Sequence, residues 1–168
     1  MAKKYMVGVL MAVLVLAFAA SVMAVNNGEK APAFDMKDQF GKVWNLSNLR
    51  GNVMIVITAN PDSGRLMGPW MDNLKTRYAG KVQIIGLMDL HTVPGIGRGF
   101  ARSRIRKETN DPLMLDFNGS VAKAYSVSDK YPVVTVIDKS GVVRAVQKST
   151  FSQNGFTDIT NAVDKALK

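Results

Sequence analysis

The sequence predicts an α/β domain built on a mixed β-sheet, and three stretches of the chain carry that prediction. Residues 53–57 are a run of β-branched and long apolar residues, which is typical of a strand buried on both faces. A helical pattern and a second buried run at 82–87 follow, and such a strand–helix–strand unit pairs its strands in parallel through a right-handed crossover. In residues 132–147, Ser140 and Gly141 predict a hairpin turn, so part of the sheet is antiparallel.

Residues 1–24 have the pattern of a secretory signal peptide. Lys3 and Lys4 give a positively charged start, residues 6–20 are apolar and uncharged, and Ala24 occupies the last position before a predicted cleavage site. The protein is therefore expected to be exported, to the periplasm of a bacterium or to the medium.

Cleavage after this segment would leave residues 25–168 as a single domain. An uncleaved anchor is the alternative, because residues 6–24 are barely long enough to span a bilayer. No charged stop-transfer cluster follows them, which favours cleavage.

Two short strands are expected before the first buried strand. Apolar and polar residues alternate at 33–36 and 43–46, and Gly41 lies in the turn between them. Ser47 is expected to cap one helical turn at residues 48–50.

The helix after the first buried strand is expected over residues 66–78, because its apolar residues recur at spacings of three and four. Pro69 lies inside this stretch, so the helix is kinked there or begins only near Gly68. Gly80 and Lys81 are expected to end it.

Strands and helices also alternate in the second half of the chain. Residues 113–116 predict a short strand, and Ser120 is expected to cap a short helix that ends at Tyr125. Residues 142–147 form the returning strand of the hairpin. Thr157 is expected to cap a final helix with one apolar face.

Two motifs resemble the AhpC/TSA, redoxin and TlpA-type branch of the thioredoxin superfamily. The pattern G-x-x-A-P-x-F-x-x-x-D-x-x-G-x-x-x-x-L-S-x-L-R-G-x-V is matched from Gly28 to Val53, and P-x-x-x-x-I-D-x-x-G is matched from Pro132 to Gly141. The resemblance implies a thioredoxin-like three-layer α/β/α sandwich with a central mixed β-sheet.

The resemblance also implies where the reactive cysteines of the family would lie. Counted from Gly51, Ser63 occupies the first cysteine position and Leu66 the second, and the chain contains no cysteine at all. Thiol peroxidase and disulfide exchange both require a thiolate, so the sequence excludes both activities.

A binding role needs no cysteine. Thioredoxin-like proteins hold extended peptides against a cis-proline loop, a form of strand addition, and the resemblance implies a cis bond between Tyr131 and Pro132. A redox-inactive binding, adaptor or scaffold protein is therefore the favoured function. The candidate binding residues belong to the former active-site loop and the predicted cis-proline: Asn60, Pro61, Asp62, Ser63, Tyr131 and Pro132.

The most distinctive surface stretch is a glycine-rich loop followed by a basic helix at residues 100–107. Arg98, Arg102 and Arg106 follow at intervals of four, so they share one helix face, which is a candidate site for an acidic partner or anionic lipid. The alternative is a solvated basic helix. The loop resembles that of YtfJ-type exported proteins, which also lack the redox cysteines.

The chain has 22 Lys and Arg residues against 13 Asp and Glu, a formal net charge of +9. Such a charge favours acidic partners or anionic membranes, although solubility alone also explains it. No nucleic-acid partner is expected, and the oligomeric state is not indicated.

Other functions stay open. Ser63 could act as a hydrolase nucleophile only beside a base, and His91 is the only histidine. A structural role, including self-assembly in an envelope complex, is a further alternative. Met67 and Met71 with His91 could be read as soft copper ligands, but methionines at helical spacing are typical of a core, so no metal or cofactor is expected.

Overall fold

The computed structural model describes residues 24–168, so the predicted signal peptide lies outside this range except for Ala24. The side chain of Val25 is buried, and its N–H donates to the carbonyl of Ala124 at 2.9 Å. Within residues 24–168, none of the helices has the length and apolar character needed to span a bilayer.

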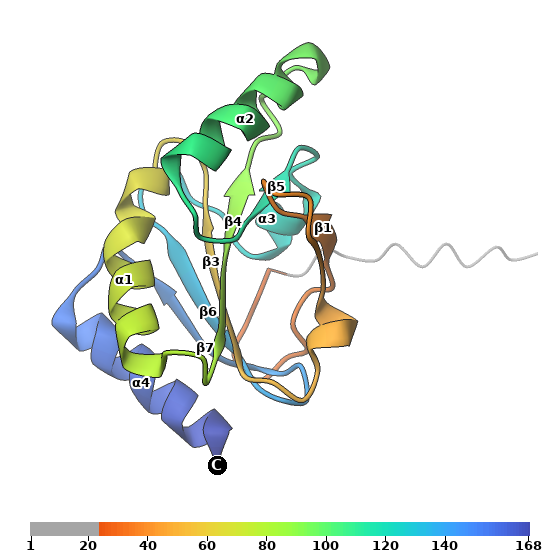
Figure 1. The fold of residues 1–168 in the computed structure, drawn as a ribbon. Coiled ribbons are helices and arrows are strands. Elements are labelled where there is room, and N and C mark those ends of the chain that lie inside the picture. Colours follow the sequence, from red (N-terminus) through yellow and green to blue (C-terminus); the bar gives the residue numbers. More distant parts are fainter. Residues whose placement is uncertain (1–23) are drawn as a thin grey trace, which may run out of the picture.

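A five-stranded mixed sheet forms the centre of the fold, in the order β5-β4-β3-β6-β7 (Figure 1). Neighbours β3, β4 and β5 are parallel, whereas β6 is antiparallel to β3 and β7 to β6. The predicted fold class is confirmed. The strands are β3 (Met54–Ala59), β4 (Gln83–Asp89), β5 (Leu113–Asp116), β6 (Val133–Ile137) and β7 (Val143–Lys148).

The central strand β3 is buried along its whole length. Val56 lies opposite Ile85 of β4 on one side and opposite Thr135 of β6 on the other. A strand paired on both edges and covered on both faces is mostly apolar, which explains the apolar run at residues 53–57, and Thr58 is its one polar residue.

Helices cover both faces of the sheet (Figure 1). On one face α1 (Met67–Tyr78) and α4 (Gln153–Leu167) share a core with β3, and Ile105 of α2 (Arg98–Glu108) packs against the same core. On the other face α3 (Ser120–Ala124) packs with Phe34 and Trp44 around the hairpin of β1 (Asp35–Lys37) and β2 (Val43–Asn45). Three short 3-10 turns complete the fold: η1 (Leu46–Leu49), η2 (Gly64–Leu66) and η3 (Gly95–Gly97).

The structure corrects two predicted helix caps. Asn45, not Ser47, caps η1, because its side-chain oxygen accepts from the N–H of Ser47 at 2.8 Å. Ser152, not Thr157, caps α4, and its hydroxyl accepts from the N–H of Gly155 at 3.2 Å. In both cases the capping residue has an extended backbone immediately before the helix, which is the conformation that aims its oxygen at the free N–H groups.

Pro69 lies in the first turn of α1, where its missing N–H removes no intrahelical hydrogen bond. Of the two predictions, a kink at Pro69 or a helix that begins only near Gly68, the second is confirmed, because α1 begins at Met67. The basic helix α2 starts at Arg98, two residues earlier than predicted, because the turn of η3 leads directly into it.

The bond between Tyr131 and Pro132 is trans, so the predicted cis-proline is wrong; residues 24–168 contain no cis peptide bond. The amide itself favours the trans isomer before proline by about 0.5–1 kcal/mol, and a family position alone does not reverse that preference. Pro132 nonetheless lies buried directly before β6, at the head of the strand as predicted.

Candidate functional site

Ser63, at the position of the family's first cysteine, is completely buried at the start of η2. Its Oγ lies 2.7 Å from the backbone oxygen of Ser128, to which it donates, and 3.0 Å from Oδ1 of Asn60. It also accepts from the N–H of Asn60 at 3.2 Å. These bonds tie the former active-site loop to the segment before β6.

The surroundings of Ser63 do not activate it as a nucleophile. Within residues 24–168, the hydrogen-bond partners of its hydroxyl are carbonyl-type oxygens and one backbone N–H, and neither kind of group is a base. His91 instead places Nδ1 at 2.8 Å from Oδ1 of Asp89, which also accepts from the His91 N–H at 3.0 Å.

The six predicted binding residues do not form one open surface. Ser63 and Pro132 are buried, Asn60 and Tyr131 are half-buried, and only Pro61 and Asp62 are exposed. Oδ1 of Asn60 accepts from the N–H groups of Asp62 and Ser63, both at 3.0 Å, which makes the loop compact.

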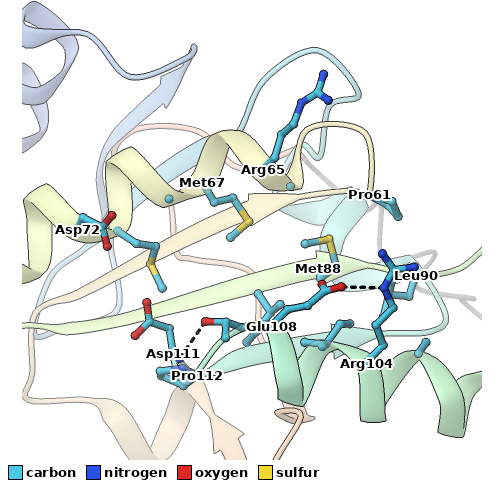
Figure 2. A pocket seen from close by; sticks show the side chains of 17 residues that line it. Pro61, Arg65, Met67, Asp72, Met88, Leu90, Arg104, Glu108, Asp111 and Pro112 are labelled. Atoms are coloured by element: carbon cyan, nitrogen blue, oxygen red, sulfur yellow. Dashed lines mark hydrogen bonds and ion pairs between the residues drawn. The ribbon is translucent and has the colours of Figure 1, made fainter.

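An open groove lies on the other side of this loop, between α1 and α2, with a volume of about 760 Å³ (Figure 2). Figure 2 shows Met67 of α1 and Met88 of β4 in its middle, with Asp111 and Arg104 on opposite sides. Apolar side chains from both helices and from two strands line it: Met67, Met71, Met88, Leu90, Ala101, Ile105 and Leu113.

Two glycines leave room for the tips of the side chains that line the groove. A Cβ at Gly86, inside β4, would overlap Cδ1 of Leu113 and would lie 3.1 Å from Cε of Met67. A Cβ at Gly64 would lie 2.9 Å from Cε of Met88. Glycine in a strand interior often marks such a close approach. Gly86 leaves room for the tip of Met67, and Gly64 leaves room for the tip of Met88.

The rim of the groove is charged, and its charges are partly paired. Glu108 accepts from Nε of Arg104 at 2.7 Å. Lys75 of α1 forms an ion pair with Asp111, which lies two residues before β5. An apolar floor with a polar rim is the usual form of a site that holds apolar groups of a ligand and orients its polar ends.

The AhpC/TSA family model matches residues 27–146. The chain belongs to the AhpC/TSA family. A search of curated protein sequences found no match.

Solved structures with a thioredoxin-like fold resemble this AhpC/TSA family member over most of its length. A protein assigned as thiol:disulfide interchange protein DsbE from Chlorobium tepidum is 21% identical, with a TM-score of 0.66, over 86% of this chain and 100% of that chain. The thioredoxin domain of a thiol-disulfide oxidoreductase from Bacteroides vulgatus is 16% identical, with a TM-score of 0.61, over 86% and 100%. At these identities the likeness shows the fold alone.

Two aspartates inside the matched range build turns. Asp38 accepts from the N–H groups of Phe40 and Lys42 and from Nε1 of Trp44, at 2.9–3.0 Å. In the β6–β7 turn, the carboxylate of Asp138 accepts from the N–H groups of Ser140 and Val142 and from Nε of Arg144, at 2.6–2.9 Å. Burial alone would raise the pKa of the Asp138 carboxyl, but hydrogen bonds from Ser140, Val142 and Arg144 outweigh it and lower that pKa to about 2.

Two arginines of the predicted basic face of this AhpC/TSA chain are exposed and also contact the body of the protein. Nη2 of Arg98 donates to the carbonyl of Phe117 at 3.3 Å, and its guanidinium lies 5.2 Å from the centre of the Phe117 ring. Arg106 donates twice to the carbonyl of Gln39, at 3.0 and 3.3 Å. Arg102 is half-buried. Arg98 and Arg106 therefore hold α2 in place.

No metal site appears among residues 24–168: no three His, Cys, Asp or Glu side chains lie close enough to hold an ion. The possible copper ligands are not brought together as a set either, since Met67 and Met71 line the groove and His91 does not.

Sequence reasoning missed the groove. Its one signal is Gly86, a glycine in the middle of a mostly apolar buried run. Met67 and Met71 belong to the core, as methionines at helical spacing predict, and they also line the groove.

Proposed function

We propose that this AhpC/TSA family member is an exported, redox-inactive binding protein, and that it holds an apolar segment of a partner protein in the groove between α1 and α2. Export rests on the signal-peptide pattern of residues 1–24. Redox inactivity rests on the absence of cysteine from the whole chain.

The open, methionine-lined groove is the observation that carries the binding role. Met67, Met71 and Met88 come from two different elements and meet in one groove of about 760 Å³. Met67 and Met71 are buried at its floor, each 6% exposed, and Met88 is half-buried. Methionine has a flexible, polarisable side chain that adapts to apolar groups of different shapes.

The position of the groove links it to the family's former active site. Pro61, Gly64 and Arg65 belong to the loop that would carry the cysteines, and the same residues form one end of the groove. A partner bound there would contact this loop without needing a thiol.

A groove-filling substitution tests the proposal. Gly68 of α1 lines the groove, and a Cβ added there would meet no atom within 4 Å. Gly68→Phe therefore places a ring in the groove without a backbone clash. Gly68→Ala is the matched control, because it brings a better helix former to the same position but leaves the groove open.

Peptides are first selected on the wild-type protein from a random display library, and their affinities are then measured by fluorescence anisotropy. We expect apolar peptides whose affinity falls at least about tenfold in Gly68→Phe and is unchanged in Gly68→Ala. Thermal unfolding of both variants checks that the fold is intact. Equal binding to all three proteins, or selection of no apolar peptide, would contradict the proposal.

A further inference from the structure

The outer end of α2 exposes two large apolar side chains that no core explains. Among residues 24–168 only four large apolar residues are exposed, and Ile96 at 99% and Phe100 at 75% are the two most exposed. Single exposed apolar residues are ordinary on a protein surface. These two lie four residues apart, at the end of α2 that projects beyond the rest of the molecule (Figure 1).

The tip contacts the body through Arg98, whose Nη2 donates to the carbonyl of Phe117 at 3.3 Å, and is open around its two outer glycines. A Cβ added at Gly95 or at Gly99 would meet no atom within 4 Å. The projection is held on both sides of the tip, because Val93 before it and Ile105 farther along α2 pack against the core. The protein thus presents Ile96 and Phe100 on a fixed, convex projection.

Cationic residues share the outward face with this apolar tip. Ser103, Arg104 and Lys107 follow Phe100 at intervals of three, four and seven, so they lie on its side of the helix, and all three are exposed. The helix contains five basic residues and a single acidic one, Glu108, which is paired with Arg104.

We propose that the Ile96–Phe100 tip of α2 binds the interface of an anionic phospholipid bilayer. Apolar side chains inserted at the boundary of headgroups and acyl chains, with Lys and Arg beside them, are the pattern of interfacial helices. Basic residues near the surface of such a bilayer add electrostatic attraction. A bilayer accommodates a convex apolar tip, whereas a protein partner would need a pocket of matching shape.

This inference is independent of the groove. Ile96 and Phe100 do not line it, and of the residues on their side of α2 only Arg104 borders the groove, which α2 otherwise meets through Ala101, Ile105 and Glu108. Loss of peptide binding and loss of lipid binding can therefore be observed separately.

The test is co-sedimentation with vesicles. Protein purified from the exported fraction, with its N-terminus determined by mass spectrometry, is mixed with vesicles of phosphatidylcholine and phosphatidylglycerol in equal parts, or of phosphatidylcholine alone. The variants are the double substitution Ile96→Ser with Phe100→Ser, and the control Val43→Ser, which removes a residue that is 54% exposed on β2.

We expect wild type and Val43→Ser to sediment with the anionic vesicles and not with the neutral ones. The double variant should lose at least about fivefold of that binding, and added salt should weaken the binding of the wild type. A Phe100→Trp variant should show a blue-shifted emission with anionic vesicles, because the native Trp44 and Trp70 are buried and report no insertion.

Equal binding to neutral and anionic vesicles would overturn the proposal. So would equal binding by the double variant, or binding to soluble poly-glutamate that is as tight as binding to the vesicles, because the site would then recognise acidic protein.

Discussion

The hydroxyl of Ser63 joins two segments that are 65 residues apart in the sequence, through its hydrogen bond to the carbonyl of Ser128. A cysteine thiol is a weak donor, whereas a hydroxyl both donates and accepts strongly. The residue that replaces the family's nucleophile therefore fits a buried, hydrogen-bonded position. At this scale Ser63 has a structural role, because it connects the loop of the former active site to the segment before β6.

Removing this hydroxyl should destabilise the protein without affecting the groove. Ser63→Ala leaves the buried carbonyl of Ser128 and the N–H of Asn60 without this partner, which costs about 1–3 kcal/mol. Urea unfolding should show that loss, and peptide affinity should stay unchanged. Ser103→Ala, on the exposed face of α2, is the control and should change stability by less than about 0.5 kcal/mol.

Asp138 makes stability depend on pH in acid. Its pKa is lowered from the ordinary value of 3.8 to about 2 in the folded protein, because hydrogen bonds from Ser140, Val142 and Arg144 outweigh its burial. The ionised carboxylate therefore adds stability that is complete above about pH 4 and is lost as the pH falls toward 2. The shift corresponds to about 2 kcal/mol at neutral pH.

Comparison of wild type with Asp138→Asn in urea, from pH 7 to pH 2, checks this. The difference in free energy of unfolding should be largest at neutral pH and should nearly vanish at pH 2. The exposed Asp158→Asn is the control. A difference that stays constant over the whole range would show that the carboxylate charge of Asp138 is not the stabilising group.

Among the elements, the β1–β2 hairpin fixes the position of the segment that closes one end of the groove. The fully buried side chain of Gln39 donates to the carbonyls of Thr109 and Asp111 at 3.3 and 2.6 Å. Its Oε1 accepts from the N–H of Leu113 at 2.9 Å, at the first residue of β5. One side chain thus pairs three backbone groups of the α2–β5 connection.

Gln39→Ala should therefore be costly. It leaves three backbone groups without this partner inside the protein, and we expect a loss of about 2–4 kcal/mol. Hydrogen exchange should show greater opening of the backbone from Thr109 to Leu113. The exposed Gln153→Ala is the control, and a loss no larger than that of this control would contradict the role of Gln39.

Most elements could be predicted because each depends on a local pattern. The run at residues 53–57 marks β3, and the structure extends the strand to Ala59 only because Thr58 and Ala59 pair with Leu87 and Met88 of β4. Such pairing involves remote residues, and no local pattern contains it. The same holds for the helix caps, because more than one nearby polar residue could cap each helix: Asn45 or Ser47 for η1, and Ser152 or Thr157 for α4.

The basic helix shows the limit of periodicity. A spacing of four residues correctly places Arg98, Arg102 and Arg106 on one face. It does not say which way that face turns. The direction follows from the carbonyls of Phe117 and Gln39, which come from distant parts of the chain and accept the guanidinium groups of Arg98 and Arg106.

At the scale of the whole molecule, the AhpC/TSA framework is intact and its thiol chemistry is missing. The framework residues were readable from sequence because turns such as the one at Asp138 use fixed spacings. The groove was not readable, because it arises where α1 and α2 pass each other over β4. Its floor depends on the contact of Gly86 with Leu113 and Met67, three residues far apart in the chain.

Methionine methyl NMR during titration with a selected peptide tests the central claim most directly. The methyl groups of Met67, Met71 and Met88 line the groove, whereas Met54 and Met114 are buried in the other core and provide internal controls. We predict that peptide shifts the first three signals and leaves the other two unchanged, and that Gly68→Phe abolishes the shifts. Binding that leaves all three groove methyls unshifted, or that moves all five equally, would contradict the account.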